Sequence, residues 1–307
     1  MACYLGIDTS NYTTSLALYS PEEGLLGFER QILRVKDGEV GLRQSDAVFQ
    51  HVQNLPVLFE KIDALRQVTL SGIGVSVAPR DEQGSYMPCF TVGNSFAQSL
   101  GRCINVPVRS FSHQAGHIAA AAWSAEQPQL LEREFLAFHV SGGTTEVVHV
   151  VPERERILQT KLVASSLDLK AGQAVDRVGQ MLSIPFPAGK ALEALALASD
   201  KHYAVKPFMR DGCPSLSGLE NKCRQMFEKQ EKYEDIAAYC LDYIAAALRC
   251  MAKSCAERYP QLPILFSGGV MSNARICSFL KNDFDCVFSD PFYSSDNAAG
   301  VAYLASL

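Results

Sequence analysis

The chain has 307 residues, of which 48% are hydrophobic and 20% are charged, and its net charge is −5. This balance is typical of a globular protein, and the length suits one large domain or two domains of roughly 150 residues. No run of about 18 apolar residues predicts a membrane span. Because the chain is acidic, binding of a nucleic acid would need a local basic patch or another subunit.

The N-terminal residues and the cysteines predict the cellular location. The N-terminus enters the apolar stretch Cys3–Ile7 without a preceding basic segment, so the sequence predicts no secretory signal. The ten cysteines are scattered and form no C-x-x-C pair, which predicts reduced thiols. We therefore expect a cytoplasmic protein.

The first half of the chain opens with two strands joined by a polar tip. Cys3–Ile7 and Ser15–Tyr19 are predicted strands, and the tip between them carries Asp8 among several hydroxyl groups. The tip is either a solvated turn or a contact for phosphate or metal-bound water. The next predicted elements are a helix over Asp46–Ile62, a strand over Leu70–Val77, a loop over Ala78–Cys89, a helix over Asn94–Leu100, a strand over Val106–Val108 and a linker over Glu126–Arg133.

Two histidines four residues apart follow that last strand. Ser112 is the predicted cap of a helix that begins at His113, and His113 and His117 then lie on one helix face, where both rings can bind one ion. The alternative is two polar residues on an amphipathic helix. Zinc peptidases carry a glutamate after the first histidine as the general base. This chain has Gln114 there, whose amide cannot accept a proton, so the sequence argues against a peptidase.

The second half repeats the opening pattern about 130 residues later. The strands Phe135–Val140 and Glu146–Val151 flank the tip Ser141–Thr145, whose two glycines allow backbone N–H groups to bind phosphate, although a simple turn is the alternative. The repeat indicates an internal duplication, with two halves around a cleft.

The remaining elements bring further polar groups to loop ends. Gly172 and Asp176 share one face of a helix over Leu169–Leu182, and Asn273 either binds a base or ribose or caps a helix. Asp296 is either a third metal ligand or an N-cap. The other predicted elements are helices over Lys190–Ala198, Glu234–Arg258 and Ala298–Leu304, strands over Pro263–Ser267 and Phe284–Phe288, and loops over Ile184–Gly189 and Ser215–Gly218.

The order of these motifs resembles that of the TsaD family, once described as glycoproteases or peptidase M22. The motifs are Gly6-Ile7-Asp8-Thr9-Ser10, His113-x3-His117, Ser141-Gly142-Gly143-x-Thr145, Ala171-Gly172-x-Ala174-x-Asp176, Pro187-x-Gly189, Ser215-x-Ser217-Gly218-Leu219, Gly268-Gly269-Val270-x-x-Asn273 and Asp296-Asn297-Ala298-Ala299. Each motif is weak alone, but the resemblance covers almost the whole chain.

The resemblance implies an α/β actin/Hsp70-like (ASKHA) fold with two duplicated RNase H-like domains around a nucleotide cleft. The expected domains are residues 1–130, with a C-terminal helix at 296–307 packing back, and residues 131–295. The implied activity is metal-assisted transfer of a threonylcarbamoyl group from threonylcarbamoyl-AMP to N6 of the tRNA adenosine beside the anticodon. The expected partners are TsaB-like and TsaE-like subunits and tRNA. The chain is also expected to form a dimer and not to bind a membrane.

The resemblance also implies the site residues. The expected ligands of one divalent iron or zinc ion are His113, His117 and Asp296. The candidate catalytic residues are Asp8, Ser10 and Asn11. An adenine nucleotide (threonylcarbamoyl-AMP, ATP or ADP) is expected at His139, Val140, Ser141, Gly142, Gly143, Asp176, Gly189, Glu193 and Asn273.

The chain departs from the family where acidic residues are expected. The family's Ser-Cys-Asp-Glu-Thr-Ser is Ser10-Asn11-Tyr12-Thr13-Thr14-Ser15 here, its Ser-Gly-Gly-His-Thr has Thr144 in place of the histidine, and Ala78-Pro79-Arg80 replaces its Gly-Pro-Gly-Leu loop. The alternative is therefore a divergent paralog that binds metal and nucleotide and acts on another substrate or as a non-catalytic partner. A peptidase or sugar-kinase-like enzyme is a third interpretation.

Overall fold

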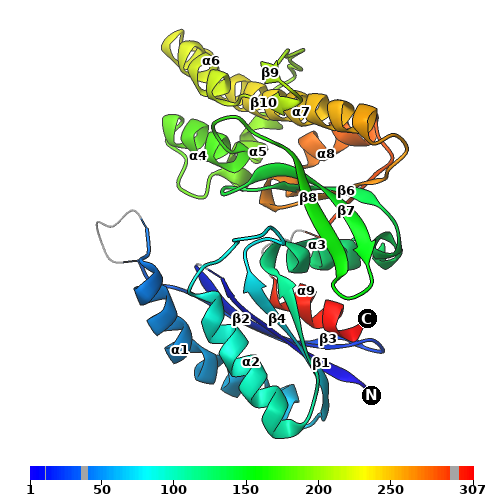
Figure 1. The fold of residues 1–307 in the computed structure, drawn as a ribbon. Coiled ribbons are helices and arrows are strands. Elements are labelled where there is room, and N and C mark those ends of the chain that lie inside the picture. Colours follow the sequence, from blue (N-terminus) through cyan, green and yellow to red (C-terminus); the bar gives the residue numbers. More distant parts are fainter. Residues whose placement is uncertain (11, 36–40, 291–296) are drawn as a thin grey trace. The chain divides into compact units, whose positions relative to one another are not determined.

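A computed structural model describes residues 1–10, 12–35, 41–290 and 297–307. The chain divides into two compact units, each built around a five-stranded sheet (Figure 1). Unit 1 contains residues 1–133, 151–160 and the described C-terminal residues from 297, and unit 2 contains residues 134–150 and 161–290. Among the described residues, no helix is long and apolar enough to cross a membrane.

The sheet of unit 1 has the order β3-β2-β1-β4-β5. Strand β2 runs antiparallel to β1 and β3, whereas β4 runs parallel to β1 and β5. The strands are β1 (Cys3–Ser10), β2 (Thr13–Ser20), β3 (Gly24–Ile32), β4 (Leu70–Ala78) and β5 (Val108–Ser112). The helices are α1 (Gln44–Lys61), α2 (Phe90–Ile104), α3 (His113–Ser124) and α9 (Ala298–Ser306), with short 3-10 helices η1 (Asp63–Arg66) and η2 (Pro128–Glu132).

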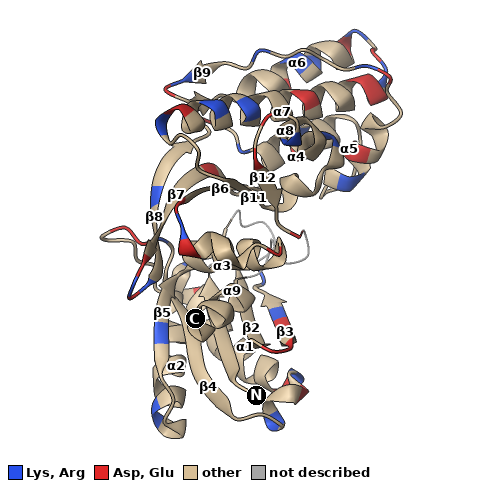
Figure 2. Ribbon diagram, turned by 90° about the vertical axis from the view of Figure 1, so that its right-hand side faces the viewer, with Lys and Arg blue, Asp and Glu red and all other residues tan. Residues whose placement is uncertain are grey.

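Alternation along β1 separates the two faces of this sheet. Leu5 and Ile7 join the hydrophobic core under α1 and α2, whereas Gly6 faces α9 so closely that a Cβ would meet the Ala298 carbonyl oxygen at 1.9 Å. Gly74 on β4 meets the Val301 carbonyl in the same way. Asp8 lies two residues after Gly6 and therefore shares the α9 side. Figure 2 shows that α3 and α9 carry no Lys, Arg, Asp or Glu.

Unit 2 repeats the topology of unit 1. Its sheet has the order β12-β11-β6-β7-β8, with β7 antiparallel to β6 and with β11 parallel to both β6 and β12. The strands are β6 (Phe135–Val140), β7 (Thr145–Glu153), β8 (Ile157–Ser165), β11 (Ile264–Ser267) and β12 (Cys286–Phe288), beside a small pair β9 (Met209–Arg210) and β10 (Cys213–Pro214). Since β6 matches β1 in position and direction, the predicted internal duplication is confirmed.

The helices of unit 2 form its largest hydrophobic core. The long α7 (Tyr233–Arg258) buries Ile236, Cys240 and Ile244 along one stripe, as predicted from its apolar spacing. The other helices are α4 (Ala171–Met181), α5 (Gly189–Ala196), α6 (Ser217–Glu228) and α8 (Ala274–Lys281), with the 3-10 helix η3 (Gly269–Ser272).

All ten cysteines of the chain are free thiols, as the sequence predicted.

Several sequence-based predictions were wrong in detail. Strands β3 and β8 and helix α6 were not predicted, α2 begins at Phe90 rather than Asn94, and β5 covers Val108–Ser112 rather than Val106–Val108. The predicted linker over Glu126–Arg133 contains η2, whose Leu130 and Leu131 are buried. These two leucines anchor the segment in the core of the protein, so its polar composition was misleading.

Candidate functional site

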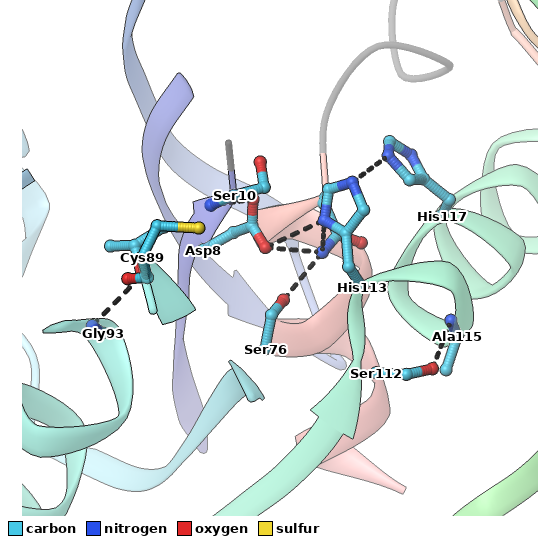
Figure 3. Close-up of polar contacts among 11 residues, drawn as sticks. Asp8, Ser10, Ser76, Cys89, Gly93, Ser112, His113, Ala115 and His117 are labelled. Carbon is cyan, nitrogen blue, oxygen red and sulfur yellow. Dashed lines mark hydrogen bonds and ion pairs between the residues drawn. The ribbon is translucent and has the colours of Figure 1, made fainter. Parts of the chain in front are cut away.

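In unit 1, four elements bring polar side chains to one point (Figure 3). Asp8 comes from the end of β1, Ser76 from β4, His113 from the start of α3, and Asn297 from the residue before α9. The predicted cap is confirmed, because Ser112 Oγ accepts a hydrogen bond from the Ala115 N–H at 3.1 Å. Strand β5 leads directly into this cap and so fixes the position of His113.

Asp8 is buried and is surrounded by hydrogen-bond donors. Its Oδ1 lies 3.0 Å from His113 Nδ1 and 2.9 Å from Asn297 Nδ2, and its Oδ2 accepts from the Ser10 N–H at 3.3 Å. Burial alone would raise the pKa of Asp8, but the charge of His113 and hydrogen bonds from His113, Ser76 and Asn297 hold this pKa below its usual range. The carboxylate is therefore ionised when it contacts His113.

The two histidines face each other through their outer ring nitrogens. His113 Nε2 lies 3.0 Å from His117 Nε2, and the ring centroids are 4.4 Å apart. Two nitrogens bound to one zinc ion at about 2.1 Å, with an angle of about 90–110°, would lie about 3.0–3.4 Å apart. A carboxylate behind the far nitrogen of a ligating histidine is a common second interaction at metal sites, and Asp8 has this place behind His113. The donor set therefore fits a metal ion.

The third predicted metal ligand, Asp296, lies outside the described residues, as does the candidate catalytic residue Asn11. Among the residues that the structure describes, no group of three His, Cys, Asp or Glu side chains could hold a metal ion. The described part of the chain thus provides two nitrogen donors and the carboxylate behind one of them.

A cavity of about 270 Å³ opens beside the histidines. Asp8 and Ser10, both predicted site residues, line it together with Tyr12 and Thr13, the two residues at the positions of the family's acidic pair. The remaining lining residues are Ser15, Pro79, Met87, Phe90, His113, His117 and Asn297. A larger cavity of about 470 Å³ in unit 1 is lined by residues that include Arg80 and Arg156, and it contains none of the predicted site residues.

Gln114 does not line the cavity beside the histidines. Its Oε1 lies 2.9 Å from the Thr160 hydroxyl, which also lies 3.1 Å from Asp81 Oδ2. The side chain that replaces the glutamate of a zinc peptidase is thus engaged in a hydrogen bond outside the histidine cavity. This arrangement agrees with the sequence-based argument against a peptidase.

In unit 2, a third cavity of about 340 Å³ is lined by five of the predicted nucleotide-binding residues. These are Gly142, Asp176, Gly189, Glu193 and Asn273, and the other lining residues are Gly172, Val175, Pro187, Lys190, Leu241, Gly269, Val270, Ser272 and Ile276. The cavity combines an apolar wall with carboxylates and one lysine, which is a suitable composition for a base, hydroxyl groups and a phosphate.

Three glycines of this cavity have open space where a side chain would project. A Cβ on Gly142, Gly189 or Gly269 would meet no atom within 4 Å among the described residues, and none of the three has a positive φ angle. Neither packing nor backbone conformation therefore requires glycine there. A ligand that approaches the backbone closely is a physical reason for glycine at such positions.

Asp176, Glu193 and Asn273 each already use one side-chain oxygen in a hydrogen bond. Asp176 Oδ1 accepts the Ala188 N–H at 2.9 Å, and Glu193 Oε1 accepts the Ala274 N–H at 2.7 Å. Asn273 Oδ1 caps α8 by accepting the Ile276 N–H at 3.1 Å. The second carboxylate oxygens and the Asn273 amide N–H groups make no hydrogen bond within the described ranges 1–10, 12–35, 41–290 and 297–307, and they are available to a ligand.

Four predicted nucleotide-binding residues do not line this cavity. Val140 is buried in the hydrophobic core, and His139 Nδ1 lies 3.3 Å from Ser267 Oγ. Ser141 closes the turn after β6, because its Oγ accepts the Thr144 N–H and its N–H donates to the Thr144 carbonyl. Gly143 belongs to the same turn. The structure therefore brings only Gly142 from this stretch to the cavity.

Sequence reasoning gave no role to Ser76, Lys190 or Asn297, which the structure brings to the two cavities or to Asp8. Ser76 had no local signal, since it lies inside an apolar strand. Asn297 stood in a motif beside Asp296, and Lys190 directly follows a Pro-x-Gly sequence at a predicted helix start. The last two could have been found by considering which side chains flank the predicted ligand-binding loops.

Comparison with known proteins extends these observations. The family model for TsaD, tRNA N6-adenosine threonylcarbamoyltransferase, matches residues 38–303. A protein of that name from Legionella pneumophila (strain Lens) is 30% identical over 99% of this chain and 92% of its own length. Another from Vesicomyosocius okutanii is 28% identical over 97% of this chain and 88% of its own length.

Solved structures support the fold alone, because their identities are low. Full-length HypF in a phosphate- and nucleotide-bound form superposes with a TM-score of 0.61 at 12% identity, covering 99% of this chain and 46% of HypF, so the chain spans about half of that protein. ROK hexokinase from Thermus thermophilus gives a TM-score of 0.54 at 14% identity, covering 99% and 98%. The predicted ASKHA fold is confirmed, and the chain belongs to the TsaD family of tRNA N6-adenosine threonylcarbamoyltransferases.

Proposed function

We propose that this chain transfers a threonylcarbamoyl group from threonylcarbamoyl-AMP to N6 of the adenosine beside the tRNA anticodon. Family membership supports this reaction. The observation that carries it is the contact of the buried Asp8 with His113, together with the 3.0 Å distance between the Nε2 atoms of His113 and His117. This arrangement holds two nitrogen donors ready for one divalent ion at the wall of a cavity.

His113 and His117 would hold the ion, with Asp296 as the proposed third ligand. Imidazole and carboxylate donors suit zinc or iron(II). When bound, the ion would act as a Lewis acid that makes the carbamoyl carbonyl more electrophilic. The proposed role of Asp8 toward this ion is to orient the His113 ring through Nδ1.

The reaction joins N6 of adenosine to the carbamoyl carbon. The bond between that carbon and the phosphate oxygen breaks, AMP leaves with the electron pair, and N6 loses one proton. Among the described residues that line the cavity beside the histidines, Asp8 is the only carboxylate. Because the pKa of Asp8 is held low, this carboxylate is a weak proton acceptor, so its assigned role is to orient the His113 ring and the N6 proton passes to solvent. We assign contacts with the threonyl hydroxyl and carboxylate to Ser10 and its neighbour Asn11.

The adenylate part of the donor is assigned to the cavity of unit 2. Asp176 and Glu193 each keep one carboxylate oxygen for ribose hydroxyls, and Lys190 supplies a positive charge for the phosphate. The open space at Gly142, Gly189 and Gly269 supports close approach of a phosphate to the backbone. The proposed contacts of His139, Val140, Ser141 and Gly143 rest on the family resemblance alone.

The partners and the location follow from the proposed substrate. A tRNA acceptor implies action in the cytoplasm, and the net charge of −5 favours tRNA binding with the help of other subunits. By family resemblance we propose TsaB-like and TsaE-like proteins for this help, and a dimer as the assembly.

A direct assay tests the reaction. The purified chain is incubated with threonylcarbamoyl-AMP, unmodified tRNA and candidate partner subunits, and the digested nucleosides are analysed by mass spectrometry. We expect threonylcarbamoyl-adenosine to accumulate with the wild type and not with Asp8→Asn. Unmodified tRNA in the presence of bound metal and nucleotide would contradict the proposed acceptor.

Tyr12 and Thr13 favour one second candidate function. They line the cavity at the positions where the family carries an aspartate and a glutamate, so the chain lacks two groups that could accept a proton from the acceptor. The second candidate is a paralog that keeps metal and nucleotide binding but uses another acceptor or acts as a non-catalytic partner. A Tyr12→Asp/Thr13→Glu variant that gains tRNA modification absent from the wild type would support this candidate.

A further inference from the structure

The carboxamide of Asn297 lies inside the polar cluster rather than at its edge. The residue is 2% exposed, and its Nδ2 lies 2.9 Å from Asp8 Oδ1, 2.8 Å from Ser76 Oγ and 2.9 Å from His113 Nδ1. An amide nitrogen carries only two hydrogens, so it can donate to two of these three atoms.

The two oxygen atoms are the better acceptors for these hydrogens. The Asp8 carboxylate already accepts from the Ser10 N–H, and its Oδ1 lies 3.0 Å from His113 Nδ1. An Nδ1 atom without hydrogen would turn its lone pair toward the carboxylate, which is repulsive. Nδ1 must therefore carry the hydrogen and donate it to Asp8, while Asn297 donates to Asp8 and to Ser76.

This hydrogen arrangement decides which nitrogen of His113 is available. A neutral ring that is protonated at Nδ1 carries its lone pair at Nε2, the atom that faces His117 Nε2 at 3.0 Å. We infer that Asn297 is a positioning residue that fixes the Asp8 carboxylate and thereby holds His113 in the tautomer whose Nε2 can bind a metal ion.

A role in stability alone does not explain Asn297. Although the residue directly precedes α9, its side chain caps no N–H of that helix. Its Oδ1 is buried without a hydrogen-bond partner among the described residues, and a buried unpaired polar atom is destabilising. An apolar residue would avoid this penalty, so the amide is better explained by what its Nδ2 does.

The first test measures the tautomer itself. We would label the histidine rings with ¹⁵N and record the ring-nitrogen resonances of the metal-free protein at mildly alkaline pH, where unbound histidines are neutral. The wild type is expected to show His113 protonated at Nδ1. A wild-type ring protonated mainly at Nε2 would overturn the inference without the need for any variant.

The second test compares two buried asparagines. In Asn297→Ala we expect a mixture of His113 tautomers and an affinity for zinc alone that is lower by about 10-fold to 100-fold. Asn54→Ala is the matched control, because Asn54 is also buried in unit 1 but donates to Thr14 rather than to Asp8. It should lose stability without a change in tautomer or zinc affinity.

The outcomes separate this inference from the proposed metal site on which it rests. A folded Asn297→Ala protein with an unchanged tautomer and zinc affinity within twofold of the wild type would overturn the role of Asn297. Failure of the wild type to bind zinc would contradict the proposed ion, and the ring-nitrogen spectrum would still decide the role of Asn297. If Asn297→Ala does not fold, the wild-type spectrum and the Ser76→Ala variant decide, since Ser76→Ala removes the second acceptor of the amide.

Discussion

Gly116 lies against Asn297 so closely that a Cβ at Gly116 would come within 1.9 Å of Asn297 Oδ1. Gly116 lies between the two histidines of α3, and the missing side chain makes room for the amide that contacts Asp8. We expect Gly116→Ala to displace Asn297, to lower the free energy of unfolding by about 1–3 kcal/mol and to weaken zinc binding. Denaturant unfolding and zinc titration measure the two effects.

Gly218→Ala is the control for this variant. It is also a helical glycine, but its nearest neighbour is the Tyr243 hydroxyl at an ordinary 3.5 Å. It should be neutral or slightly stabilising, since alanine favours helix. A Gly116→Ala protein as stable as the Gly218→Ala protein would mean that α3 and α9 adjust without loss.

The open glycines of unit 2 give the opposite expectation. Gly189→Ala and Gly269→Ala should change the free energy of unfolding by no more than about 0.5 kcal/mol, because nothing occupies the space of the added methyl group. Their affinity for ADP should fall about tenfold, because the methyl group projects into the cavity. Calorimetric titration of ADP measures this affinity.

Gly218→Ala is also the matched control for nucleotide binding. A Cβ at Gly218 would make only an ordinary contact with the Tyr243 hydroxyl at 3.5 Å, and Gly218 does not line the cavity. ADP affinity should stay at the wild-type value in this variant. Equal loss of affinity in Gly218→Ala and Gly189→Ala would place the nucleotide elsewhere than proposed.

The histidine pair predicts metal content directly. His113→Ala and His117→Ala should each reduce bound zinc or iron, and the double variant should abolish it, because two of the proposed ligands are then absent. Elemental analysis of the purified proteins measures this. His149→Ala is the control, since His149 on β7 pairs with Glu134, and its loss should leave the metal content unchanged. Metal retained by the double variant would mean that the ligand assignment is wrong.

His51 predicts a pH dependence of stability. Burial lowers the pKa of His51 to about 4, although the charge of Asp8 acts in the opposite direction. In the unfolded chain a histidine titrates near 6.5, so protons bind preferentially to the unfolded state as pH falls from about 6.5 to about 4. The contribution of neutral His51 to the free energy of unfolding is therefore fully present above about pH 6.5. About 3 kcal/mol of it is lost as the pH falls to about 4.

A His51→Gln variant isolates this contribution. Glutamine does not titrate, so the free energy of unfolding of the variant should fall less steeply between these pH values than that of the wild type. Chemical denaturation at a series of pH values gives both slopes. Parallel slopes would show that His51 is protonated equally easily in the folded and unfolded states.

Local patterns were sufficient for elements with strong periodicity or a clear cap. The hairpin of β1 and β2, the Ser112 cap of α3 and the long α7 follow from alternation, capping chemistry and helical spacing. Helix α6 had a usable signal that was missed, because Leu219, Cys223 and Met226 recur at helical spacing and are buried. Strand β3 had a weak signal, since its residues are mostly half-buried and do not alternate clearly.

The sites depend on contacts that local patterns do not contain. The histidine spacing was readable because four residues make one helical turn. The Asp8–Asn297 contact joins residues 289 positions apart, and only the fold brings them together. In the same way, Asn273 could be read as a ligand contact or as a helix cap, and its cap hydrogen bond is now evident while its amide N–H groups remain available.

The packing of α9 on β1 and β4 has a consequence for biosynthesis. The first strand of the chain stays without its covering helix until residues 298–306 have left the ribosome, because Gly6 and Gly74 meet the backbone of that helix. Asp8 also lacks Asn297 until then. A nascent chain can therefore complete unit 2 first, and it acquires the finished histidine cluster only after the residues of unit 2 have been synthesised.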